Sequence, residues 1–169
     1  SLNGVFFFTA DDNVHGVELW AYSNVNNTSW MVKDLNTGST GSSPAYPIIV
    51  NNTLFFSAET VDVGVELWAY SLNNNTVWLV ADINNGTDSS MLLNRMMVNV
   101  GNTIYFNADD GNSGTELWGF NLSNFTNSLV ADITPGSQSS NNPFNDGHAV
   151  IIDSTVMFTA WDGDPNAAG

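Results

Sequence analysis

One tripeptide, Glu-Leu-Trp, recurs along the chain and constrains its fold more than any other feature. It first occurs at Glu18-Leu19-Trp20 and returns 48 and then 50 residues later, at 66–68 and 116–118. An Ala stands eight positions before each Glu, and an Asp stands sixteen positions after it. Landmarks at a fixed spacing indicate a tandem repeat of one supersecondary unit. The repeat positions expected to be structural are Glu18, Trp20, Asp34, Glu66, Trp68, Asp82, Glu116, Trp118 and Asp132.

Each copy of the repeat has the pattern of four short strands, illustrated by 47–50, 54–58, the Glu-Leu-Trp strand and 78–83. Turns rich in Asn, Asp and Gly separate these strands. The aromatic strands, such as Val5-Phe6-Phe7-Phe8, are apolar on both faces, so a sheet must be covered on both sides. Stacked propeller blades satisfy this condition, whereas β-solenoids usually have shorter repeats and fewer hairpin turns. We therefore predict an all-β, propeller-like array of four-stranded antiparallel blades.

About three and a half repeats fit the chain. The expected divisions are a partial blade at 1–40, blades at 41–88 and 89–138, and a partial blade at 139–169, in a single repeat domain or a fragment of one. Closed propellers have at least about four blades. We therefore expect a processed or partial product, in which a longer chain or further copies complete a larger propeller, or the repeats form an open array.

The charge of the chain excludes several partners. The chain has two basic and 17 acidic residues, which gives a formal net charge of −15. This charge argues against electrostatic binding to nucleic acid or to an anionic membrane. No apolar run approaches the roughly 20 residues of a membrane span, so we expect no membrane insertion. The chain has no Cys, which excludes disulfides, thiolate metal sites and Cys nucleophiles.

The repeat resembles the ELWxxDGT family of secreted microbial proteins over nearly the whole chain. The chain departs from the family after each Trp, where Tyr22-Ser23, Tyr70-Ser71 and Phe120-Asn121 replace Asp-Gly-Thr. The resemblance implies a propeller-like extracellular repeat, often in large surface proteins, without an established catalytic set. The segments that carry it are Gly16-Val17-Glu18-Leu19-Trp20, Gly64-Val65-Glu66-Leu67-Trp68 and Gly114-Thr115-Glu116-Leu117-Trp118, with Asp34-Leu35, Asp82-Ile83, Asp132-Ile133, Gly38-Ser39, Gly86-Thr87 and Gly136-Ser137.

No catalytic site is expected. A Glu that recurs in every unit is interpreted as structural, with its carboxylate accepting backbone N–H groups of the preceding turn. His15 and His148 stand alone, so their spacing supports neither a zinc site nor a Ser-His-Asp arrangement. No cofactor is required, although acidic turns supply the oxygen ligands that calcium prefers. The weak calcium candidates are Asp11, Asp12, Asp109, Asp110, Asp162 and Asp164.

The surface carries seven Asn-x-Ser/Thr sequons, which are acceptors for N-glycosylation. Five of them fall in the same inter-strand loop of successive repeats, so we expect glycans on one solvent-facing edge. The candidate Asn residues are Asn26, Asn27, Asn51, Asn74, Asn85, Asn121 and Asn124.

Two functions follow as hypotheses. The first is a non-catalytic extracellular structural or adhesive protein, glycosylated and located at a cell surface or in a filament, whose partners are copies of itself or further repeats. The alternative is a carbohydrate-recognising propeller module of a larger secreted protein or hydrolase. Its candidate residues are Trp161, Asp162, Asp164 and the stretch Asn145-Asp146-Gly147-His148.

Overall fold

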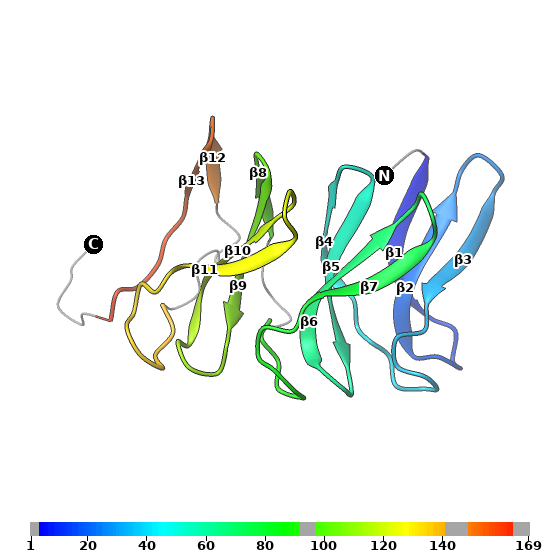
Figure 1. Ribbon diagram of the computed structural model, residues 1–169. Helices are drawn as coiled ribbons and strands as arrows, with labels where there is room; N and C mark the ends of the chain where they lie inside the picture. Colours follow the sequence, from blue (N-terminus) through cyan, green and yellow to red (C-terminus); the bar gives the residue numbers. More distant parts are fainter. Residues whose placement is uncertain (1–3, 92–96, 141–148, 164–169) are drawn as a thin grey trace. The chain divides into compact units, whose positions relative to one another are not determined.

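A computed structural model describes residues 4–91, 97–140 and 149–163, and it contains only strands and loops in these ranges (Figure 1). The strands are three to eight residues long. The strands are β1 (Val5–Asp11), β2 (Val17–Ser23), β3 (Thr28–Lys33), β4 (Ala45–Val50), β5 (Thr53–Thr60), β6 (Gly64–Ser71), β7 (Thr76–Ala81), β8 (Val98–Val100), β9 (Thr103–Asp109), β10 (Thr115–Asn121), β11 (Thr126–Ala131), β12 (Val150–Ile152) and β13 (Thr155–Met157).

The strands pair in chain order into antiparallel sheets, as predicted for propeller-like blades. The two complete sheets are β4-β5-β6-β7 and β8-β9-β10-β11. Before them lies the three-stranded sheet β1-β2-β3, and after them the hairpin β12-β13. The partial units at the two ends thus contain the second to fourth strands of one repeat and the first two strands of another.

The Glu-Leu-Trp motif sets an identical register in three repeats. Its Glu pairs with the Ala eight residues earlier, as in Ala10↔Glu18 and Ala58↔Glu66. An irregularity in the pairing with the fourth strand falls between Leu and Trp in every copy, between Leu19 and Trp20 in the first. A bulge at that point increases the local twist, so each blade receives the same twist at the same place.

The described residues form two compact units. The first extends to Asp82 and includes Gly86–Ser89, and the second comprises Ile83–Asn85 and the residues from Ser90 onward. In the first unit, Leu19 of β2 lies in one buried cluster with Leu54, Phe56, Ala58 and Tyr70, so two sheets share a core. In the second unit, the buried residues Val98 and Leu117 pack with Tyr105, Val156 and Phe158. Adjacent sheets within each unit therefore bury the apolar faces seen in the sequence.

The repeated Glu joins one blade to the next. Glu18 is fully buried, and its carboxylate accepts the backbone N–H of Ser42 at 2.9 Å and the hydroxyl of Ser42. The carbonyl of Ser42 in turn accepts the N–H of Glu59 from the following sheet at 2.8 Å. The prediction that the N–H donors come from the preceding turn is wrong for Glu18. The donors belong to the segment that leaves the blade after its last strand.

The second unit repeats parts of this joint. Glu116 is fully buried and accepts the backbone N–H groups of Ile133 and Thr134 at 3.0 and 3.4 Å. The carbonyls of Ser90 and Ser140 accept N–H groups from Asp109 and Trp161 at 2.9 and 2.7 Å. Ser42, Ser90 and Ser140 are spaced 48 and 50 residues apart, like the three Glu residues. They form a further repeat position beside the Ala, Glu and Asp landmarks.

A glycine lets the connecting segment cross the blade at this joint. Gly64 has a φ of +65°, and a Cβ there would lie 2.8 Å from the backbone of Asp88. Gly114 has a φ of +70°, and its Cβ would lie 2.6 Å from the backbone of Gln138. Any side chain would combine left-handed backbone strain with a collision against main-chain atoms. The Gly two positions before each Glu is therefore part of the joint.

Ser42→Ala is predicted to lower the free energy of unfolding by about 1–3 kcal/mol, because one oxygen of a buried carboxylate loses its hydroxyl partner. Equilibrium urea unfolding measures this difference. Ser39→Ala, at an exposed position of the same segment, is the control and should change the value by less than about 0.5 kcal/mol. Equal effects of the two substitutions would contradict a specific role for Ser42.

Candidate functional site

The hairpin between the third and fourth strands of a blade carries an Asn-x-Thr sequon at the same repeat position in three copies. The Asn residues are Asn26, Asn74 and Asn124, spaced like the Glu residues by 48 and 50 positions. All three are exposed, and the Thr two residues later begins the fourth strand. The same modifiable amide is thus held at an equivalent point of successive blades.

A hydrogen bond inside each sequon orders this Asn side chain. The hydroxyls of Thr28, Thr76 and Thr126 donate to the amide oxygens two residues earlier, at 2.7, 2.7 and 2.8 Å. This bond uses Oδ1 and not Nδ2, the atom to which an N-linked sugar attaches. The arrangement therefore leaves the acceptor nitrogen outside the contact that orders the side chain.

The middle residue of the sequon has a different, structural role. It occupies the left-handed region in each copy, with φ of 55° at Asn27, 54° at Asn75 and 57° at Phe125. In the first two copies a Tyr hydroxyl donates to its amide oxygen, at 3.0 Å from Tyr22 and 2.9 Å from Tyr70. Asn tolerates left-handed backbone better than most residues, and the Tyr contact fixes the turn.

In the third copy both partners of this contact change together. Phe120 replaces the Tyr and Phe125 replaces the Asn, and their rings lie 6.4 Å apart at an angle of 55°. An aromatic contact thus takes the place of a hydrogen bond. The paired change shows that the middle position serves the turn, so Asn27, although it is itself a sequon Asn, differs in surroundings from Asn26.

The remaining sequons lie outside this equivalent set. Asn51 is exposed in the turn between β4 and β5, and Asn85 is exposed after β7. Asn121 is half-buried at the end of β10, and its amide oxygen accepts the backbone N–H of Ser123 at 2.8 Å. The sequons expected in one loop are therefore two kinds of site, three in the repeated position and two, Asn27 and Asn121, in hydrogen-bonded turn positions.

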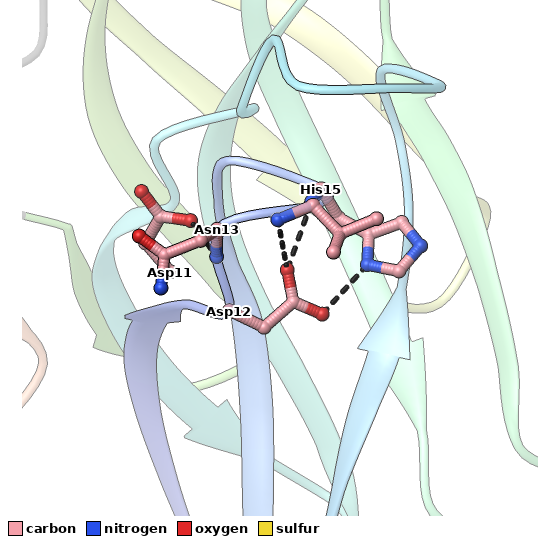
Figure 2. A network of polar contacts seen from close by, with 5 residues as sticks. Asp11, Asp12, Asn13 and His15 are labelled. Carbon is pink, nitrogen blue, oxygen red and sulfur yellow. Dashed lines mark hydrogen bonds and ion pairs between the residues drawn. The ribbon is translucent and has the colours of Figure 1, made fainter.

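The acidic turn after β1 is organised by its own carboxylates (Figure 2). Asp12 accepts the backbone N–H groups of Val14 and His15 through Oδ1, at 2.9 and 2.8 Å. Its Oδ2 lies 2.7 Å from Nδ1 of the His15 ring, and Asp11 accepts the N–H of Asn13 at 2.7 Å. The hydrogen bonds of His15 and Val14 to Asp12 lower the pKa of this carboxyl to about 2. The same side-chain bond raises the pKa of His15 above its ordinary value.

The corresponding turn after β9 uses its carboxylates in the same way. Asp109 accepts the N–H of Gly111 at 2.8 Å, and Asp110 accepts those of Asn112 and Ser113 at 3.0 and 2.7 Å. Among the described residues, no group of three or more His, Asp or Glu side chains is arranged to hold a metal ion. Calcium binding stays a prediction, and Asp164 lies outside the described residues.

The repeated Asp and Trp residues do not reproduce the joint made by Glu18. Burial raises the pKa of Glu18 above its ordinary value. The hydrogen bonds from Ser42 and from the backbone of Leu35 lower this pKa by less, and the nearby charge of Asp34 raises it. Oδ1 of Asp34 and of Asp82 is buried without a hydrogen-bond partner among the described residues, while Oδ2 of Asp82 lies 3.5 Å from the N–H of Gly86. Asp132 is exposed. Three indole N–H groups are also buried without a hydrogen-bond partner in the described part of the chain, those of Trp20, Trp68 and Trp118.

Trp161 occupies a repeat position, although no other copy has a Trp there. It occupies the position of Glu59 and Asp109, directly after the Ala landmark. Its N–H donates to the carbonyl of Ser140, and its carbonyl accepts the hydroxyl of Thr134, both at 2.7 Å. Its side chain is 38% exposed. Of the other residues proposed to act with it, Asp162 is exposed, and 145–148 and Asp164 lie outside the described ranges.

A small pocket in the first unit is apolar and has no titratable side chain in its lining. It can make van der Waals contacts but cannot donate or accept a proton. The lining residues are Phe7, Phe8, Thr9, Leu19, Pro44, Ala45, Pro47 and Phe56.

The fold is similar to that of a known propeller protein. TolB from Acinetobacter baumannii matches 93% of this chain with a TM-score of 0.56 and 13% sequence identity. The match spans 40% of the TolB chain, so this chain corresponds to about two fifths of that protein's length. At this identity the similarity shows a β-propeller-like fold. No family model and no curated protein matches the sequence.

The described residues include no helix that is long and apolar enough to cross a membrane.

Asp12→Asn is predicted to return the pKa of His15 toward its ordinary value, as measured by an NMR titration of the imidazole. The contribution of His15 to stability is complete below its unfolded pKa of 6.5 and is lost as pH rises through the higher folded value. The contribution of Asp12 is complete above 3.8 and is lost as pH falls through about 2. The control is Asp11→Asn, which leaves the His15 contact in place. An unchanged His15 titration in Asp12→Asn would show that this contact does not set its pKa.

Proposed function

We propose that this chain is a non-catalytic, extracellular structural or adhesive repeat protein, a secreted component of a cell surface or filament that displays N-glycans on its hairpins. The observation that carries the proposal is the exposed sequon at one repeat position of three blades, at Asn26, Asn74 and Asn124. Because the blades share one register, a sugar on each would stand at an equivalent point of the fold.

The use of the other polar groups supports a structural rather than a catalytic role. Glu18 and Glu116 are buried in hydrogen bonds to backbone and hydroxyl groups of the connecting segments. Asp12 and Asp110 accept N–H groups of their own turns. These carboxylates thus have identified structural partners. A glycan adds bulk and solubility at the hairpin without replacing any of these contacts.

The resemblance to the ELWxxDGT repeats of secreted proteins supports an extracellular location. N-glycosylation of Asn-x-Ser/Thr is likewise a modification of surface loops in secreted proteins. Both properties concern the outside of the cell, and they arise from different positions of the repeat. The sequon hairpin lies where this chain departs from the family's Asp-Gly-Thr turn.

A carbohydrate-recognising module is the second candidate, favoured by the exposed side chain of Trp161. An aromatic ring on a loop presents an apolar face and a polar N–H to a ligand. Titration with soluble oligosaccharides, followed by tryptophan fluorescence, tests this alternative. A saturable change that Trp161→Ala abolishes, but Trp78→Ala does not, would favour it over the structural role; Trp78 is the control because it is similarly exposed, at 37%.

Intact-peptide mass spectrometry of the protein from its native source tests glycan display. We expect sugars at Asn26, Asn74 and Asn124, and lower occupancy at Asn27, which holds the left-handed position of the turn, and at Asn121, which is half-buried. Asn74→Gln should remove one glycan without changing occupancy at the other two. The matched control is Asn73→Gln, because Asn73 is exposed in the same turn but is not in a sequon. Bare side chains at all seven sequons would refute glycan display.

A further inference from the structure

The first sheet leaves an apolar face exposed that its counterparts in later repeats keep buried. Phe6 and Phe8 of β1 are 48% and 41% exposed. The equivalent residues of β5 and β9, two positions and four positions before the Ala landmark, are 0–1% exposed. These counterparts are Leu54, Phe56, Ile104 and Phe106.

Contacts within the first unit show to which face of the sheet Phe6 and Phe8 belong. Leu54 and Phe56 lie in one cluster with Leu19, so this face of β5 is covered by the preceding sheet. Phe7 points to the opposite side of β1 from Phe6 and Phe8, because strand side chains alternate, and its ring packs edge-on against Tyr70 at 5.8 Å. Phe6 and Phe8 therefore belong to the face that in β5 contacts a preceding repeat. We name this side of a sheet the backward face and the opposite side the forward face.

The hairpin β12-β13 leaves the complementary, forward face exposed. Val156 and Phe158 lie on the backward face of the hairpin, are half-buried and pack on the cluster of Val98 and Leu117. Met157 and its cross-strand partner Val150 lie on the other side and are 48% and 54% exposed. Ile152 shares that side and is 52% exposed. Met157 occupies the repeat position of Phe7, whose ring contacts the next sheet in the first unit.

We propose that a second copy of this chain fills the open backward face: the forward face of β12-β13 in one copy packs on Phe6 and Phe8 of the next. The contact repeats the packing of forward on backward face that joins the first two sheets. It uses a different surface on each copy, so successive copies form a closed ring or an open filament. The inference rests on the proposed structural function and names its partner.

Charge opposes this association and gives it a recognisable salt dependence. Each copy carries a formal charge of −15, so two copies repel one another at low ionic strength. Added salt shortens the screening length to about 3 Å at 1 M while leaving the burial of Phe and Met side chains favourable. Self-association should therefore strengthen with salt, whereas docking of a basic partner on the acidic surface should weaken.

Sedimentation velocity of the 169-residue chain over a range of protein and salt concentrations tests the proposal. We expect concentration-dependent association that Phe8→Asp and Met157→Asp each weaken by about tenfold or more, because a charge would enter the apolar contact. The control is Val61→Asp, because Val61 is 70% exposed on the turn between β5 and β6 and should leave association unchanged. Circular dichroism confirms that each variant is folded.

Mixing the two weakened variants distinguishes the two surfaces. Phe8→Asp retains the intact hairpin face and Met157→Asp retains the intact Phe face, so their mixture should form a one-to-one complex that grows no further. A chain that remains a single copy at every concentration would overturn the proposal, and so would a mixture that fails to form this complex. The protein used here carries no sugar, so failure of glycan display and failure of self-association are separate results.

Discussion

The structure depends on a buried carboxylate that accepts hydrogen bonds from the chain as it leaves the blade. Glu18 would be costly to bury alone, but the N–H and hydroxyl of Ser42 satisfy it at the point where the backbone crosses to the next sheet. The carbonyl of the same Ser accepts an N–H from that next sheet. One residue thus connects a side chain in one blade with the backbone of another, and the apolar faces are held in contact around it.

The sequence predicted the blades because their landmarks are strongly constrained. In each joint an Ala pairs with the Glu, and the crossing has room only for Gly. Few substitutions preserve this arrangement, so the period of 48 to 50 residues is visible in the sequence. The observed strand ends differ from the predicted ones by one or two residues: β5 runs from Thr53 to Thr60 instead of 54–58, and β7 runs from Thr76 to Ala81 instead of 78–83. Strand ends depend on the hairpin turns, where local hydrogen bonds decide which residue pairs last.

The joint and the turn chemistry were less accessible to sequence reasoning. Ser42 was missed because Ser is common on a polar surface, and the donors to Glu18 were assigned to the wrong segment because spacing does not reveal which loop crosses the sheet. The repeat position of Trp161 is hard to recognise in the sequence because its side chain differs from the acids at that position, although its backbone makes the same contact. Two Phe residues in the third repeat replace the pair Tyr22 and Asn27 of the first. The sequence does not reveal this paired change, because it does not show which side chains are in contact.

Because the chain crosses to the next sheet at Ser42, the end of a repeat depends on whether it is defined by strands or by hydrogen bonds. By its strands a repeat ends at Lys33 or Ala81, but by its hydrogen bonds it ends only where Ser42 or the equivalent Ser reaches the next sheet. A gene duplication or an engineered fusion that cut directly after the fourth strand would leave the carboxylate of the last Glu without its donors. The heritable module of this architecture therefore includes part of the linker, and arrays can lengthen by whole modules only when the break falls beyond that Ser.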